Sequence, residues 1–211
     1  MDSRLFLPGW GASASLYEAS LPSSWLALEP PSFAASRGSF AEYRNWLRLE
    51  LNSRGRSRLA GHSMGAALAI LAAADDPELV EELVLISPAG LPLEKPIRKS
   101  LDDFLRQLLR GRYPRGLAAS AALAVVRAPR AALRLALHVR DLDLRRECER
   151  IRESGIPVTV VGCISDTLVT ASHARTLADA LGARYEELDV RGGHMWMLDD
   201  GARFAALVSG H

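Results

Sequence analysis

A serine stands at the centre of the pentapeptide Gly61-His62-Ser63-Met64-Gly65, which follows a short apolar run and leads directly into an Ala- and Leu-rich stretch. This is the G-x-S-x-G pattern of a nucleophile elbow, in which the serine lies on a strained turn between a strand and a helix. The flanking glycines fit such a turn because a Cβ there would collide with neighbouring backbone. The pattern therefore predicts that the Ser63 hydroxyl projects above a sheet as a nucleophile.

A serine hydroxyl is a weak nucleophile at neutral pH, so it needs a base, and that base needs a carboxylate to orient it. Asp166 lies just past an apolar run that ends at Val161, and His194 lies just past the next apolar run. The order Ser, Asp, His along the chain is the order expected where such an elbow is built on an α/β sheet. We therefore predict a catalytic triad of Ser63, His194 and Asp166, with Asp189 as the rival acid.

The other histidines receive structural interpretations. His62 is interpreted as a packing residue of the elbow, because the elbow geometry displays only the serine. His138 and His173 fall on expected helices with no apparent partner, and His211 is the terminal residue. None of these four histidines is assigned a catalytic role.

Short apolar strands alternate with helices over most of the chain. Strands are predicted at residues 4–7, 25–28, 58–60, 80–86, 157–161 and 184–190, and helices near residues 14–19, 40–51, 66–74 and 203–208. Such alternation implies right-handed crossovers and an α/β fold with a doubly wound, mostly parallel sheet of about six strands. Pro30 and Pro31 follow the second strand, and because proline cannot donate ladder hydrogen bonds, this strand suits the edge of the sheet.

The pattern becomes purely helical in the middle of the chain. We predict a helical lid subdomain over residues 91–154, inserted into a core formed by residues 1–90 and 155–211. Between Lys95 and Arg152 there are fifteen Lys and Arg residues against six Asp and Glu residues, so this segment is basic while the remainder is acidic. An ordinary solvated helix face in an Arg-rich protein would give the same composition.

Length and composition exclude several classes of protein. With 211 residues, 48% of them hydrophobic, the chain can bury the core of one domain. No secretory leader and no apolar run long enough to cross a bilayer is recognised, so a soluble cytoplasmic protein is expected. Cys148 and Cys163 lack metal-ligand spacing, so neither a metal site nor a disulfide framework is expected. The arginines come without a nucleic-acid-binding motif, which disfavours nucleic acid as a partner.

At these residues the chain resembles the α/β-hydrolase fold family, and the resemblance covers nearly its full length. The segment Pro8-Gly9-Trp10-Gly11 is similar to the H-G-W-G oxyanion loop of small carboxylesterases, including those of the biotin pathway that cleave pimeloyl-acyl-carrier-protein methyl ester. The resemblance implies an oxyanion hole formed by the backbone N–H groups of Trp10 and Met64. It further implies hydrolysis of a carboxylic ester or thioester through an acyl-enzyme, with no cofactor.

The chain departs from the family pattern in three places. Pro8 replaces the usual histidine of the oxyanion loop, although the donor there is a main-chain amide. The strand at residues 4–7 is expected to correspond to the third strand of the family, with no counterpart of the first two. Glu29-Pro30-Pro31 stands where the family has an Asp-x-Pro-G-x-G turn, which affects the edge of the sheet more than the triad.

Two further expectations concern the substrate. Apolar residues near the triad and in the lid could line an acyl pocket, although core packing accounts equally for Trp196 and for the lid stripe; they are Gly9, Phe104, Leu105, Leu108, Met195 and Trp196. Four lid arginines could attract an acyl-carrier protein or the phosphates of coenzyme A; they are Arg106, Arg110, Arg112 and Arg115.

Other functions remain open on the sequence alone. The same triad supports cofactor-free perhydrolysis or carbon–carbon bond hydrolysis, and the fold could serve as a ligand sensor without turnover. A dehalogenase or an epoxide hydrolase is disfavoured, because both need a carboxylate where Ser63 stands. The oligomeric state is also open, since pairing across the edge strand at residues 25–28 would make a dimer.

Overall fold

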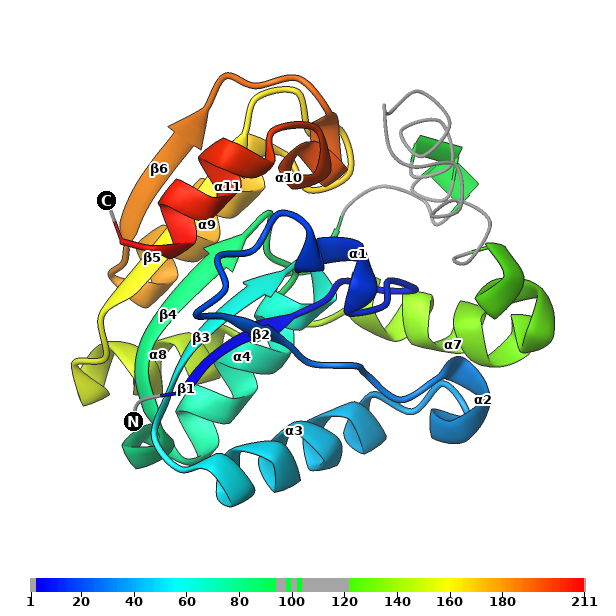
Figure 1. The fold of residues 1–211 in the computed structure, drawn as a ribbon, viewed down its shortest axis with the longest axis horizontal. Coiled ribbons are helices and arrows are strands. Elements are labelled where there is room, and N and C mark those ends of the chain that lie inside the picture. Colours follow the sequence, from blue (N-terminus) through cyan, green and yellow to red (C-terminus); the bar gives the residue numbers. More distant parts are fainter. Residues whose placement is uncertain (1–2, 94–97, 100–101, 104–121, 211) are drawn as a thin grey trace.

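A computed structural model describes residues 3–93, 98–99, 102–103 and 122–210. Its centre is one six-stranded sheet in the order β2-β1-β3-β4-β5-β6, and every neighbouring pair is parallel (Figure 1). The strands are β1 (Ser3–Leu7), β2 (Leu26–Ala27), β3 (Ser57–His62), β4 (Val80–Ile86), β5 (Val158–Cys163) and β6 (Arg184–Leu188). The predicted fold class is confirmed, as is the number of strands.

Apolar residues on both faces of the strands explain why the sheet is covered on both sides. Leu5 and Leu7 of β1 pack into one buried cluster, and Phe6, which points to the opposite face, packs into another. Because successive side chains of a strand alternate between faces, a strand that is apolar throughout needs helices on each side. The six strands therefore form the middle of three layers.

The helices divide between these two faces. The first layer comprises α3 (Phe40–Arg54), α4 (Met64–Asp75), α8 (Arg145–Ser154) and α9 (Ala171–Leu181), whose buried residues share one cluster. The second layer comprises α1 (Ser15–Glu18), α10 (Trp196–Asp199) and α11 (Gly201–Val208), whose buried residues belong to the other cluster. In Figure 1, α3 and α4 lie on one side of the strands, and α10 and α11 lie on the other.

Helix α4 is the central helix of the first layer. Every residue from Met64 to Ala74 is buried, and alanine makes up half of the helix, so its backbone can approach both the sheet and α3 closely. A helix that is apolar on all sides is expected only inside a protein. Asp76 and Pro77 follow it, and the helix ends as predicted.

The edge strand β2 is shorter than predicted. Only Leu26 and Ala27 pair with β1, although the N–H of Leu28 still donates to the carbonyl of Phe6 across 2.9 Å. The two prolines that follow prevent a longer ladder. The short helix α2 (Phe33–Ser36) comes directly after them, with Ser32 as its N-cap, and was not predicted.

The chain between β4 and β5 contains α7 (Pro129–Arg140) and α8. Helix α8 packs against α4 and α9, and its Cys148 and Ile151 side chains are fully buried in the core. The division into a core and a lid over residues 91–154 stays a prediction. Three of the predicted pocket residues and all four of the singled-out lid arginines lie outside the described residues: Phe104, Leu105, Leu108, Arg106, Arg110, Arg112 and Arg115. Within the described part of the chain, no helix combines the length and apolarity that crossing a bilayer requires.

Candidate active site

Ser63 occupies the tight turn between β3 and α4, as the elbow motif predicts. Its φ of 53° and ψ of −114° are a conformation that residues with a side chain rarely adopt. The two flanking glycines make the turn possible. A Cβ on Gly61 would lie 2.6 Å from the Gly65 backbone, and a Cβ on Gly65 would lie 2.1 Å from the Leu7 carbonyl oxygen. The elbow therefore packs directly against the end of β1.

The segment after β1 lies beside this elbow. A Cβ on Gly9 would come within 3.4 Å of the Ser63 Cβ, so the predicted oxyanion loop touches the serine. The Trp10 indole donates to the Ala132 carbonyl of α7 across 3.1 Å, which anchors the loop. Met64 is the first residue of α4, where backbone N–H groups have no carbonyl partner within the helix.

The predicted base and acid are paired. The Nδ1 atom of His194 lies 2.8 Å from Oδ2 of Asp166, and both residues are about 2% exposed. The other carboxylate oxygen of Asp166 accepts from the N–H groups of Leu168 and Val169 across 2.8 and 3.0 Å. These backbone donors hold the carboxylate in place and leave its second oxygen directed at the imidazole.

Ser165 connects the loop that carries the acid to the loop that carries the histidine. Its hydroxyl donates to the Val190 carbonyl across 2.7 Å and accepts from the Gly193 N–H across 3.1 Å. The hydroxyl thus bridges the chain just after β5 and the chain just after β6. This role of Ser165 was not predicted, because a serine next to an acid carries no distinctive signal.

His62 makes two buried hydrogen bonds rather than only packing. Its Nδ1 lies 2.9 Å from the Tyr17 hydroxyl and its Nε2 lies 2.9 Å from the backbone carbonyl of His194. The His62 and His194 rings are neighbours, with centroids 4.6 Å apart. Burial and, secondly, the electrostatic interaction with the neighbouring His194 ring lower the pKa of His62 well below 6.5, which favours the neutral ring. This contact places the His194 ring beside the elbow that carries Ser63.

The rival residues are placed elsewhere. Asp189 is exposed, and the His194 Nδ1 bonds to Asp166 instead. His138 is exposed on α7 and stacks on Phe40, with the centroids 5.1 Å apart. His173 lies in the first turn of α9 and is half-buried.

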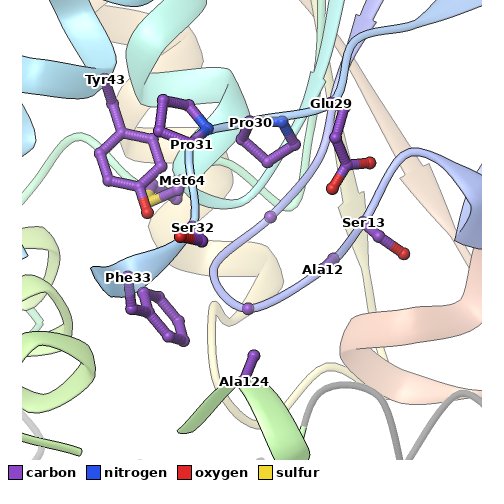
Figure 2. Close-up of a pocket in the computed structure, with 12 residues that line it drawn as sticks. Ala12, Ser13, Glu29, Pro30, Pro31, Ser32, Phe33, Tyr43, Met64 and Ala124 are labelled. Carbon is purple, nitrogen blue, oxygen red and sulfur yellow. The ribbon is translucent and has the colours of Figure 1, made fainter. Parts of the chain in front are cut away.

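One cavity of about 140 Å³ lies against the oxyanion loop (Figure 2). Its walls are mostly apolar, and Figure 2 shows the Glu29 carboxylate at the side where Ala12 and Ser13 lie. Glu29 Oε2 accepts from the Ala14 N–H across 2.7 Å, which braces this loop. The lining residues are Gly9, Gly11, Ala12, Ser13, Glu29, Pro30, Pro31, Ser32, Phe33, Tyr43, Met64 and Ala124.

Of the predicted pocket residues, Gly9 lines this cavity. Met195 and Trp196 do not; they are 4% and 0% exposed, and Trp196 packs edge-on against Phe204 in the second cluster. Trp196 therefore packs in the core, which was the alternative to a pocket role for this residue. In the described ranges, no group of three or more His, Cys, Asp or Glu side chains could hold a metal ion.

Comparison with known proteins agrees with this fold. Residues 5–207 match the model of the alpha/beta hydrolase family, so the chain belongs to that family. This match confirms the predicted family and the predicted class of enzyme, a hydrolase. Among curated protein sequences, none matches the chain.

Three solved structures illustrate the likeness of fold. An esterase from Exiguobacterium antarcticum has a TM-score of 0.77 and 16% identity, over 99% of this chain and 91% of that one. A lipase-esterase related protein from Clostridium acetobutylicum has a TM-score of 0.77 and 13% identity, over 99% of this chain and 93% of that one. An enol-lactonase from Burkholderia xenovorans has a TM-score of 0.75 and 19% identity, over 99% and 90%.

Proposed function

We propose that the protein hydrolyses a carboxylic ester or thioester with a short acyl group, and that Ser63, His194 and Asp166 carry out the reaction. The observation that carries this proposal is the buried His194–Asp166 pair, which lies beside a serine on a strained elbow. A histidine whose Nδ1 hydrogen is committed to a carboxylate presents Nε2 as a base.

The reaction proceeds in two steps. His194 removes the proton of the Ser63 hydroxyl as the oxygen attacks the substrate carbonyl, and Asp166 stabilises the imidazolium that forms. His194 then returns the proton to the departing alcohol or thiol, which leaves an acyl group on Ser63. A water molecule, activated by the same histidine, attacks the acyl-enzyme and releases the acid.

Two backbone N–H groups would stabilise the negative oxygen of each tetrahedral intermediate. They belong to Trp10 in the loop after β1 and to Met64 at the start of α4. Gly9 packs against Ser63, and the indole of Trp10 is held by Ala132, so this loop is braced before any substrate arrives. A preorganised donor of this kind is typically worth about 3 kcal/mol of transition-state stabilisation.

The cavity beside the oxyanion loop is the proposed site for the acyl chain. It is lined by Gly9 and Met64, the residues next to Trp10 and Ser63, and its volume of about 140 Å³ is small. A cavity of about 150 Å³ holds a benzene molecule, so this one suits a chain of about six carbons. Acylated carrier proteins or coenzyme A remain proposed substrates through the lid arginines, because thioesters react by the same chemistry.

The function is tested by comparing the wild type with Ser63→Ala on p-nitrophenyl acetate, butyrate, hexanoate and decanoate. The matched control is Ser209→Ala, at an exposed serine after α11. We expect the wild type and the control to turn over many equivalents of butyrate or hexanoate ester. Ser63→Ala should lose about 10³-fold or more in kcat. Full activity of Ser63→Ala would refute the nucleophile, and a single turnover by the wild type would favour a ligand sensor.

A further inference from the structure

The side chain of His62 is linked at both ring nitrogens, and neither bond is explained by packing. One bond joins it to the Tyr17 hydroxyl of α1 and the other to the backbone carbonyl of His194, each across 2.9 Å. Tyr17 is 0% exposed and His62 is 1% exposed, so water does not compete for either bond. A buried polar group that loses its hydrogen-bond partner costs the folded protein free energy, so both bonds contribute to holding the ring in place.

The two partners fix the tautomer of His62. A carbonyl oxygen only accepts hydrogen bonds, so Nε2 of His62 carries the hydrogen that is donated to the His194 carbonyl. In a neutral ring, Nδ1 then holds a lone pair, and the Tyr17 hydroxyl donates to it. A chain of two directed hydrogen bonds therefore runs from α1, through the elbow, to the main chain of His194.

The loop that carries His194 needs such a restraint. Gly192 and Gly193 precede it with φ values of 101° and 58°, and only a single turn of 3₁₀-helix follows β6 there. The chain at this point is outside the sheet ladder, so side chains add to the few backbone hydrogen bonds of the turn itself. Ser165 holds the Gly193 N–H, and His62 holds the His194 carbonyl.

The same ring also touches the oxyanion loop. A Cβ added to Gly9 would lie 2.9 Å from Nδ1 of His62, so the imidazole lies directly against the Gly9 backbone. His62 thus contacts the oxyanion loop, α1 and the histidine loop, while its own backbone adjoins Ser63. Displacement of a reacting group by about 1 Å can cost 10²-fold in rate.

We infer that His62 is a positioning residue which, with Tyr17, holds the main chain of His194 and thereby aligns the imidazole with Ser63. This inference rests on the proposed function, because it acts through His194 as the base. His62 contacts no reacting atom in this account. It differs from a packing residue in that its effect depends on a hydrogen bond to the His194 carbonyl.

The first test uses three variants with substrate and a fluorophosphonate probe that labels Ser63. His62→Leu removes the donor, His62→Gln keeps an N–H donor of comparable reach, and Tyr17→Phe removes only the hydroxyl. We expect kcat to fall by about 10- to 100-fold in His62→Leu with KM nearly unchanged. His62→Gln should recover part of this loss, and Tyr17→Phe should lose about 3- to 10-fold. His138→Gln, at an exposed histidine, is the matched control.

A double-mutant comparison separates positioning from general damage. If His62 acts through His194, replacing His62 should strongly slow the labelling of Ser63 in the wild-type background. In the His194→Ala background, where the base is already absent, the same replacement should have hardly any effect. Equal slowing in both backgrounds, or no slowing in either, would overturn the inference. Where His62→Leu does not fold by circular dichroism, the same comparison with Tyr17→Phe and His62→Gln decides the outcome.

The two proposals fail in different ways. If the wild type neither turns over esters nor labels at Ser63, the proposed function fails and the positioning role fails with it. If the wild type labels rapidly and the His62 and Tyr17 variants label at the same rate, only the positioning role fails.

Discussion

Oδ2 of Asp166 accepts a hydrogen bond from Nδ1 of His194 across 2.8 Å, and both side chains are almost completely buried. Removal of water strengthens this pair, because the effective dielectric constant there is lower than in solvent. The Leu168 and Val169 N–H groups, which hold the other oxygen, prevent the carboxylate from rotating away. The orientation of the imidazole is therefore fixed before a substrate binds.

Replacing Asp166 with asparagine should remove most of the activity. The amide has nearly the same shape but no charge, and it can present an N–H group to the imidazole, which favours the wrong tautomer. In a serine triad this change lowers kcat by about 10⁴-fold, and we expect a loss of that order on p-nitrophenyl butyrate. Asp189→Asn changes the exposed rival carboxylate and should leave kcat/KM unaltered. If Asp189→Asn lost activity and Asp166→Asn kept it, Asp189 would be the acid of the triad.

Gly65→Ala should destabilise the protein severely. The added methyl group would lie 2.1 Å from the Leu7 carbonyl oxygen and 2.6 Å from the Pro8 oxygen, and backbone cannot move aside cheaply. We expect the free energy of unfolding in urea to fall by about 4 kcal/mol or more. Gly155→Ala is the control, since its left-handed φ of 73° is strained but the space around it is open. That change should cost only about 1 kcal/mol, and similar losses for the two variants would contradict the packing described for the elbow.

His62 should make the stability of the protein depend on pH. Burial lowers the pKa of its folded form well below 6.5, so beneath that pH the unfolded chain binds a proton that the folded protein excludes. The stability contribution is complete above pH 6.5 and declines as the pH falls, by up to about 1.4 kcal/mol per pH unit. The groups that face the ring are Tyr17 and His194, and His194 is paired with Asp166.

Urea unfolding of the wild type and His62→Gln, measured between about pH 7.5 and 5.5 on either side of the ordinary histidine pKa, checks this expectation. The wild type should lose stability more steeply with acid than the variant. Parallel curves for the two proteins would mean that His62 is not held neutral in the folded state.

Enlarging Ala124 should shorten the preferred acyl chain. Its side chain lines the cavity beside the oxyanion loop, so Ala124→Leu would fill part of a space of only about 140 Å³. We expect KM for the hexanoate ester to rise by about tenfold, equivalent to about 1.4 kcal/mol, while the acetate ester is little affected. Ala122→Leu, at an exposed position nearby, is the control. An unchanged chain-length profile would place the acyl group elsewhere.

The sequence predicted the parts of the site that depend on local geometry and on strand order. An elbow motif needs only its two glycines and the adjoining strand and helix. Because the strands are parallel, Asp166 and His194 both lie beyond the carboxyl ends of their strands. The sequence did not reveal the roles of Tyr17 and Ser165. Tyr17 lies 45 positions from its partner His62, and no spacing rule joins α1 to the elbow. Their hydrogen bonds depend on how loops pack, which periodicity does not encode.

The boundaries of the edge strand and the surroundings of Trp196 were also beyond the sequence. Residues 25–28 have the composition of a strand, but only Leu26 and Ala27 pair, because the prolines that follow divert the chain. Trp196 lies two residues after His194, so its position in the sequence suited a pocket role and core packing equally. The turn between them instead directs the indole into the core against Phe204.

The central claim is that Ser63 is a nucleophile activated by His194. Its most direct test is to incubate the folded wild-type protein with a fluorophosphonate probe and to locate the adduct by peptide mass spectrometry. The account predicts one adduct, on Ser63, formed rapidly in the wild type and about 10³-fold more slowly in His194→Ala. An unmodified Ser63, or labelling that proceeds equally fast without the histidine, would contradict it.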